Sequence, residues 1–358
     1  MTTICLSMIV KDEARVIARC LASVRPFLSS WVVVDTGSTD ETCELVTRAL
    51  EGIPGELHRR PWRGFGASRT EALALARGKA DYSLVIDADD VLEPAATFTL
   101  PHLTHDAYRL RVLDRELAYD RIHLMKNTLP WRYEGVLHEY ATCDRPATEA
   151  ILGGLVYRRH YDGARSSDPE KYRKDAAILE SALRDEPSNT RNMFYLAQSY
   201  RDAGLIDEAI RVYERRAEMD GWDEEVFYSS LMIARLRERT CGDRAVVWTA
   251  YLRAHQTRPS RAESMCDLAR YCRTGGEFAL AYVFASAAVS IPRPCDALFV
   301  DESIYVWRAL DEYAAACFFV GRYGDALAAN RRLLAEGKLP ASEVARVRAN
   351  LDLSEKGG

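Results

Sequence analysis

The sequence has few of the features that mark secreted, membrane-spanning or nucleic-acid-binding proteins. Its nine cysteines include no Cys-x-x-Cys pair, so neither a zinc site nor a disulfide framework is indicated. It has no run of 18 apolar residues that could span a membrane, and a formal net charge of −5 argues against nucleic acid as the main partner. The first residues lack the basic region, apolar core and cleavage site of a signal peptide. Because free cysteines suit a reducing compartment, we expect a cytoplasmic protein.

The length of 358 residues suits two domains, and the first part alternates between apolar runs and helical patterns. Four strands are predicted, at residues 3–10, 31–35, 56–60 and 82–87, of which the first and the last are expected to be buried and the third is short. Four alternations of strand and helix predict a parallel sheet with helices on both faces. Ser38 and Glu41 have the spacing of a capping box for the second helix. Half-exposed or edge strands are predicted further on, at residues 108–112, 119–124, 131–140 and 155–161.

Three carboxylates, Asp87, Asp89 and Asp90, directly follow the fourth apolar run. In a parallel sheet such acids lie at the carboxyl end of a buried strand, where α/β proteins bind their ligands. Hard oxygen ligands suit Mg²⁺ or Mn²⁺, and Mg²⁺ is commonly held by one or two carboxylates together with phosphate oxygens. The alternative is that one acid caps a helix beginning near Val91, which explains only one acid of the three.

From Asp168 onward the pattern is helical and repeats internally. Gly204, Gly242, Gly276 and Gly321 are separated by 38, 34 and 45 residues. Small or apolar residues follow each glycine at similar distances, among them Ala209, Val247, Ala281 and Ala326. A unit of 34 residues with small residues at the helix crossing is typical of tetratricopeptide repeats, although the first-helix tryptophan is absent. A generic helical bundle is the alternative.

Four ordered motifs resemble those of family 2 glycosyltransferases with the GT-A fold: residues 8–13, 33–40, 66–70 and 87–90. The resemblance covers roughly residues 1–140. The helical repeats resemble those fused to such domains, including in peptide S-glycosyltransferases and lipopolysaccharide-core glucosyltransferases. The resemblance implies an α/β GT-A domain at residues 1–165, Rossmann-like with a mixed and mostly parallel sheet. An all-α tetratricopeptide-like solenoid follows at residues 166–358.

The resemblance also assigns roles in binding a nucleotide-diphosphate sugar. Asp89 would ligate the metal ion, and Asp87 would contact the ribose or a water on the metal. Asp35 would lie in the nucleoside pocket, and Arg69 would help to hold the nucleotide. The same motifs place further donor contacts at Val10, Lys11, Glu13, Thr36 and Ala88.

The sequence departs from the family pattern at three points. Many members carry a second acid at the position of Thr36, which reads the base. Since Thr36 is neutral and can donate as well as accept, the base is left open, with a UDP-sugar as the expected donor. Thr70 replaces the usual asparagine after the helix arginine, and no Gln-x-x-Arg-Trp motif is visible. His160 could add a late metal or phosphate contact, although a lone histidine is more often structural.

An inverting transfer, which the resemblance implies, needs a base for the acceptor's proton and charge stabilisation for the departing diphosphate. The densest candidate stretch is residues 133–140. If it were extended, Glu134 and His138 would share one face and Glu139 the other. We favour Glu139 as the base, with Glu134 second and His138 or Asp162 next. An exposed, ion-paired glutamate is the alternative for either acid.

Two classes of function follow from these patterns. The first is an inverting, metal-dependent glycosyltransferase whose acceptor is a peptide, a protein or a glycan. Its repeats would bind that acceptor or a second subunit, which would make a homodimer. The second is a helical-repeat adaptor that has lost catalysis, which the intact Asp87-Ala88-Asp89 disfavours. A nucleotidyltransferase would need a Gly-rich, Arg-containing loop after the first strand, and residues 11–15 are not such a loop.

Overall fold

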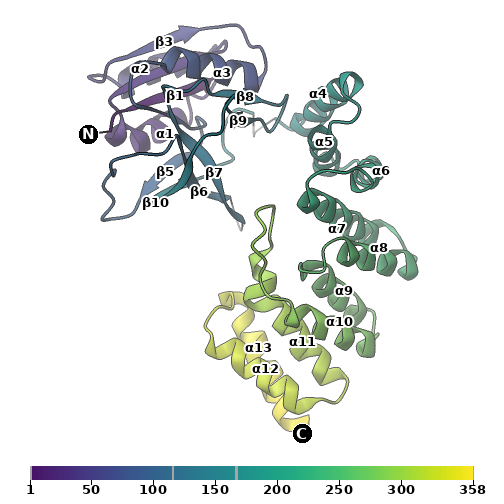
Figure 1. The fold of residues 1–358 in the computed structure, drawn as a ribbon. Helices are drawn as coiled ribbons and strands as arrows, with labels where there is room; N and C mark the ends of the chain where they lie inside the picture. The colour runs from purple at the N-terminus through teal and green to yellow at the C-terminus, as the bar shows by residue number, and fades with distance from the viewer. Residues whose placement is uncertain (1, 115–116, 166–167, 358) are drawn as a thin grey trace. The chain divides into compact units, whose positions relative to one another are not determined.

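The computed structural model describes residues 2–114, 117–165 and 168–357 (Figure 1). They form two compact units, Met1–Leu205 and Ile206–Gly358. The sequence predicted the domain boundary at 165/166, and the first helix described after that point begins at Lys171. In the structure, however, the first two helices, α4 (Lys171–Asp185) and α5 (Thr190–Asp202), group with the α/β unit. Within the described residues, no helix combines the length and the apolar character needed to cross a bilayer.

The first half of the α/β unit contains the four parallel strands that the apolar runs predicted. They are β1 (Ile4–Val10), β2 (Ser30–Asp35), β3 (Gly55–Arg59) and β4 (Tyr82–Val85). β1 and β2 are almost wholly buried because helices cover both faces of the sheet. α1 (Ile17–Val24) and α2 (Thr42–Ala49) pack on one face, and α3 (Phe65–Ala76) packs on the other. A short 3₁₀ turn, η1 (Arg25–Phe27), follows α1.

The second half extends this sheet and makes it mixed. It adds β5 (Val91–Pro94), β6 (Ala107–Asp114), β7 (Leu117–Lys126) and β10 (Glu149–Arg158). The order across the sheet is β3-β2-β1-β4-β7-β6-β10-β5, and β7 runs antiparallel to both of its neighbours. The GT-A-like, mostly parallel α/β architecture expected from the sequence is therefore confirmed.

Two local predictions in this unit are wrong, and one alternative fails. The predicted edge strand at 131–140 is instead a separate hairpin of β8 (Arg132–Glu134) and β9 (Tyr140–Thr142). The strand predicted at 155–161 is β10, which lies between β6 and β5 because β5 forms the edge. No helix begins near Val91, since β5 occupies that position, so the helix-capping alternative for the acids fails.

The capping box predicted at Ser38 and Glu41 does not form. Ser38 accepts a hydrogen bond from the backbone N–H of Asp12 at 3.0 Å. Asp40 receives the N–H of Thr42, also at 3.0 Å, and so satisfies the start of α2 in its place. Side chains from two loops therefore join at the carboxyl ends of β1 and β2.

The second unit is helical, as the repeat pattern predicted. Its elements are α6 (Ile206–Ala217), α7 (Asp223–Thr240), α8 (Arg244–Thr257), α9 (Glu263–Thr274), α10 (Phe278–Ser290), the π-helical turn η2 (Ile304–Arg308), α11 (Ala309–Phe319), α12 (Tyr323–Ala335) and α13 (Ala341–Gly357). Gly276 and Gly321 occupy the turns after α9 and α11 with φ of 82° and 76°, which glycine adopts without strain. The small residues Ala281 and Ala326 that follow them are fully buried.

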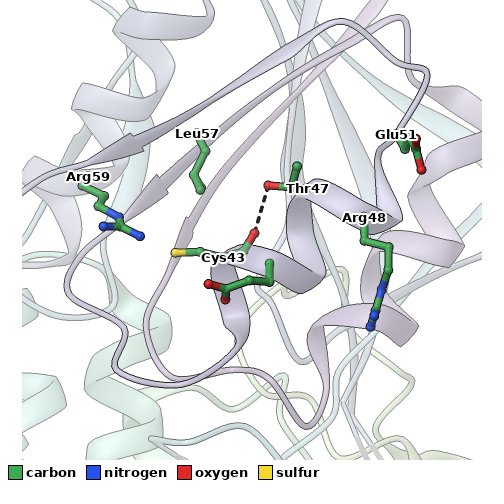
Figure 2. A pocket seen from close by; sticks show the side chains of 7 residues that line it. Cys43, Thr47, Arg48, Glu51, Leu57 and Arg59 are labelled. Carbon is green, nitrogen blue, oxygen red and sulfur yellow. Dashed lines mark hydrogen bonds between the residues drawn. The ribbon is translucent and has the colours of Figure 1, made fainter.

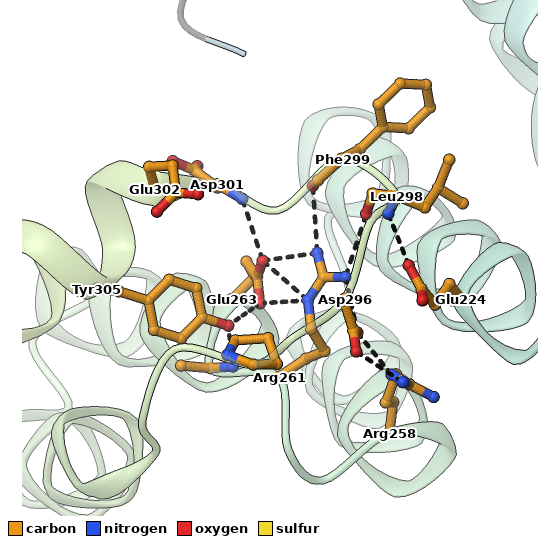
Figure 3. Close-up of polar contacts among 12 residues, drawn as sticks. Glu224, Arg258, Arg261, Glu263, Asp296, Leu298, Phe299, Asp301, Glu302 and Tyr305 are labelled. Atoms are coloured by element: carbon orange, nitrogen blue, oxygen red, sulfur yellow. Dashed lines mark hydrogen bonds and ion pairs between the residues drawn. The ribbon is translucent and has the colours of Figure 1, made fainter. Parts of the chain in front are cut away.

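The longest interval between the repeat glycines contains a non-helical segment, residues 291–301, which follows α10. A buried ion cluster fastens this segment to α9 (Figure 3). Arg261 and Glu263 are 0% and 1% exposed, and they pair at 2.7 Å. Arg261 also donates to the carbonyls of Leu298 and Phe299, and Glu263 accepts the N–H of Asp301. The extra residues in this repeat are thus held by charge-assisted hydrogen bonds.

Candidate active site

The candidate site lies at the carboxyl ends of β1, β2 and β4, where the sequence placed its ligands. Val10 is paired with Asp35 in the register of β1 and β2. Asp35 is 3% exposed and accepts the N–H of Ser38 at 2.9 Å. Thr36 donates its hydroxyl to the carbonyl of Val10 at 3.1 Å. The Thr36 hydroxyl therefore already has an acceptor within the protein, whereas Lys11 is exposed.

Arg69 on α3 joins two carboxylates that are far apart in the sequence. Its Nε donates to Glu139 Oε1 at 2.6 Å, and its Nη2 donates to Asp87 Oδ1 at 2.5 Å. The Arg69 side chain is 10% exposed and that of Glu139 is 6% exposed, so the ion pair is largely shielded from water. Burial disfavours ionisation of Asp87, but Arg69 and then Arg121 outweigh it and hold the Asp87 pKa below its usual value.

The remaining acids of the site lack such compensation. Burial and the neighbouring Asp87 raise the pKa of Asp89, and they raise the pKa of Asp90 to about 7. Burial raises the pKa of Glu13 to about 7, with Asp89 adding to the effect. Arg19 lies nearby, but it pairs with Asp162 at 2.7 Å and offers Asp89 only a bond to its backbone carbonyl. Burial therefore disfavours the ionised forms of Glu13, Asp89 and Asp90 in the protein by itself.

The residues around Asp89 fit a divalent cation. An added Cβ on Gly163 would lie 2.7 Å from Asp89 Oδ2, so the backbone closes on this carboxylate and leaves no space for a side chain. Asp90 is less suited, because its two oxygens accept from the Tyr157 hydroxyl (2.6 Å) and the His160 N–H (2.7 Å). No three His, Cys, Asp or Glu side chains in the described part of the chain form a ready cage. A cation completed by phosphate oxygens needs none.

The structure separates the predicted base candidates. Glu139 reaches Arg69, as described, whereas Glu134 pairs with Arg132 at 2.6 Å and accepts from the Tyr140 hydroxyl. The chain turns between them, with φ of 106° at Gly135 and 52° at His138. His138 is exposed, and its ring stacks on Tyr195. The structure thus brings Glu139 close to Asp87 through Arg69. The side chains of Glu134 and His138 are instead engaged by Arg132 and Tyr140 and by Tyr195, respectively.

The half-buried His160 donates its backbone N–H to Asp90. Ala88 lies between Asp87 and Asp89 in the chain, in the same turn. Sequence reasoning missed Tyr157 and His123. Tyr157 donates to Asp90, accepts the Asp87 N–H at 3.2 Å and stacks on the His123 ring. The alternation of β7 and β10 could have placed both side chains on an inward face.

A separate hollow lies between α2 and β3 (Figure 2). It is lined by Cys43, Glu44, Thr47, Arg48, Glu51, Leu57 and Arg59. Thr47 donates its hydroxyl to the Cys43 carbonyl at 3.0 Å, as the dashed line in Figure 2 marks. None of the acids that follow β4 lines this hollow, so we do not assign it to the candidate site.

Comparisons with known proteins identify the family of the first domain. Residues 5–103 match the model described as "Glycosyl transferase family 2". A TPR repeat-containing protein of Synechococcus elongatus is 28% identical over 313 residues, which cover 81% of this chain and 76% of that protein. The SPbeta prophage-derived glycosyltransferase SunS of Bacillus subtilis is 23% identical over 58% of this chain, which spans about half (51%) of SunS.

Among solved structures, S. aureus TarS 1–349 in complex with UDP-GlcNAc has a TM-score of 0.34 at 14% identity, covering 71% of this chain and 91% of TarS 1–349. The family match coincides with β1 to the acids after β4, and the repeat-containing relative extends along most of the chain. The chain therefore carries a family 2 glycosyltransferase domain, matched over residues 5–103, which is followed by tetratricopeptide-like helical repeats.

Proposed function

We propose that the enzyme transfers a sugar from a nucleotide-diphosphate sugar to a peptide, protein or glycan acceptor, with inversion and with the help of Mg²⁺ or Mn²⁺. The observation that carries this proposal is the grouping of Asp89 and Asp90 after β4 with Glu13 after β1, where burial disfavours the ionised form of each carboxyl and raises its pKa. Asp89, with Asp87 beside it, would hold the cation. A bound cation supplies charge that stabilises the departing diphosphate.

Glu139 is our candidate for the base that receives the acceptor's proton. Arg69 fixes it in the site through Oε1, and among the described residues no side chain forms a hydrogen bond to Oε2. Burial away from bulk water strengthens the electrostatic interactions of such a group. Glu134 is the weaker candidate, because Arg132 and Tyr140 already engage both of its oxygens.

The donor is proposed to be a UDP-sugar. The Thr36 hydroxyl donates its hydrogen to the carbonyl of Val10, so that hydrogen is not free to bind the nucleobase. Reading of the base would then depend on Asp35 and on the backbone of Val10 and Lys11, which lie together at the ends of β1 and β2.

A thermal-shift screen of the full chain tests the proposed donor and metal together. A nucleotide-diphosphate sugar with Mn²⁺ or Mg²⁺ should raise the melting temperature, because a ligand of the native state stabilises it by mass action. The same donor in excess chelator, and the Asp89→Asn variant with donor and metal, should give a much smaller shift. If neither UDP-sugars nor other nucleotide-diphosphate sugars shift the wild-type chain, the proposed activity is wrong.

A further inference from the structure

The turn that carries Glu139, residues 135–139, is enclosed by two helices. On one side lies the start of α3, where an added Cβ on Gly66 would come within 2.9 Å of the Gly135 carbonyl oxygen. On the other side lies α5, the second helix after the α/β sheet. Its Arg191 donates from Nη2 to the His138 carbonyl at 2.8 Å. The turn is therefore packed from both sides and not free to move as a surface loop.

Aromatic contacts strengthen the attachment of α5 to this turn. The rings of His138 and Tyr195 stack with centroids 3.9 Å apart and an interplanar angle of 8°. The Arg191 guanidinium lies 5.0 Å from the ring centroids of both Tyr140 and Tyr195, within the range of cation–π attraction. A hydrogen bond and a ring stack thus connect α5 to His138 of the turn, and a cation–π contact connects α5 to Tyr140, which directly follows the turn.

The backbone of His138 indicates that these contacts determine the shape of the turn. Its φ of 52° is in the left-handed region, which residues other than glycine rarely adopt. Such a conformation persists only where the surroundings impose it. Arg191 holds the carbonyl and Tyr195 holds the ring of this same residue, and the next residue is Glu139.

We infer that α5 is a positioning element of the active site, in which Arg191 and Tyr195 hold the 135–139 turn so that Glu139 stays at Arg69. This inference rests on the proposed role of Glu139 as the base. If this inference holds, α5 acts in turnover and does not merely carry an acceptor-binding surface. Displacement of a catalytic group by about 1 Å can lower the rate by about a hundredfold.

Substitutions in the full chain test the inference. Arg191→Ala and Tyr195→Leu should each lower kcat by about tenfold or more, with the donor KM within about twofold of wild type, because the donor site itself is untouched. Tyr195→Phe, which keeps the ring, should retain most of the activity. Arg184→Ala, an exposed arginine on α4, is the matched control and should behave as wild type. If Arg191→Ala raises the donor KM and leaves kcat unchanged, Arg191 binds the donor and the inference is wrong.

A double mutant separates this inference from the proposed function. If Arg191 acts through Glu139, adding Arg191→Ala to Glu139→Gln should lower kcat no further, and losses that multiply would contradict the inference. Full activity of Glu139→Gln alone would overturn the proposed base instead. Amide hydrogen exchange of residues 135–139 needs no activity: it should be faster in Arg191→Ala than in Arg184→Ala, and equal rates would overturn the positioning role.

Discussion

Each of the two units buries a cluster of arginine and carboxylate side chains, and the clusters differ in how their charges balance. In the repeats, Arg261 and Arg258 face Glu263 and Asp296, so two cations meet two anions. In the α/β unit, Arg69 compensates Asp87 and Glu139, whereas Asp89, Asp90 and Glu13 have raised pKa values. The first cluster is complete within the protein, and the second is not.

The difference separates a structural use of buried charge from a functional one. A buried ion pair is tolerated when every partner is present, and removing one partner leaves a costly unpaired charge. In the repeats, the Tyr305 hydroxyl and the backbone N–H of Asp301 supply further bonds to Glu263. In the α/β unit, burial is the main cause of the raised pKa values of Asp89, Asp90 and Glu13, and a bound cation would favour their ionised forms. Perturbed acids of this kind cluster at functional sites.

The largest effect is expected from removing the proposed metal ligand, Asp89. This change tests whether the acids of the α/β unit serve function and not stability. Asp89→Asn should lose essentially all transfer, because a neutral amide cannot replace an anionic ligand. Its melting temperature without metal should be unchanged or higher, since the substitution relieves repulsion from Asp87. Activity assays and thermal unfolding measure the two effects. Full activity in this variant, or of the wild type in excess chelator, would show that transfer does not depend on a metal.

The opposite behaviour is expected for the repeat cluster. Arg261→Ala should lower the free energy of unfolding of the second unit by about 3–5 kcal/mol, because it leaves Glu263 buried without its partner. Urea unfolding followed by circular dichroism measures the loss. Arg253→Ala, an exposed arginine on α8, is the control and should change the stability by less than about 0.5 kcal/mol. A similar small effect for Arg261→Ala would remove the distinction between the clusters.

A third test concerns the acid that Arg69 holds. Glu139→Gln keeps the shape and removes the basicity, and should lower turnover about a hundredfold with donor binding little changed, because base catalysis commonly contributes 10²–10⁴-fold. Glu134→Gln is the matched control and should retain activity. Inactivity of Glu134→Gln with normal turnover of Glu139→Gln would move the assignment to Glu134. If both variants turn over normally, His138 and Asp162 are the next candidates, and Asp162 is already paired with Arg19.

The smallest expected effect is on how the melting temperature depends on pH, and it concerns His123 in the α/β unit. Burial, followed by Arg121, lowers the pKa of His123 to about 3, whereas an unfolded histidine titrates near about 6.5. Between pH values of about 3 and about 6.5, His123 is protonated in the unfolded chain and neutral in the folded chain. The stability that depends on a neutral, buried His123 is therefore present above pH of about 6.5 and is lost as the pH falls. His123→Gln should flatten the fall in melting temperature between pH 7.5 and pH 5.5, and exposed His102→Gln should not. Equal slopes in both variants would contradict the assignment.

The sequence predicted the parts of the fold that depend on neighbouring residues. Apolar runs with acids at their ends located β1, β2 and β4, since a strand buried on both faces has a clear composition. Glycines with positive φ located the turns after α9 and α11. The site acids followed from the same reasoning, because parallel strands end together at one edge of the sheet.

The errors concern contacts between distant residues. The 131–140 stretch has a strand-like composition, but the turn at Gly135 and His138 depends on α3 and α5, which lie 53 or more residues away. The Ser38 side chain could have capped the helix that follows Glu41, or it could have accepted a hydrogen bond from the backbone of Asp12. The structure contains the second of these bonds, a tertiary contact. The local sequence of α5 does not indicate that this helix groups with the α/β unit either, because Arg191 and Tyr195 are ordinary helical residues.

The segment that Arg261 fastens has a consequence for proteolysis. Residues 291–301 form a long non-helical stretch in the repeats, and exposed stretches of this kind are where proteases nick a folded chain. Its single basic residue, Arg293, is followed by Pro294, a bond that trypsin does not cleave, and its side chain pairs with Glu302 at 2.6 Å. Trypsin therefore has no cleavable site in this stretch, and a native digest should leave the repeats intact across it.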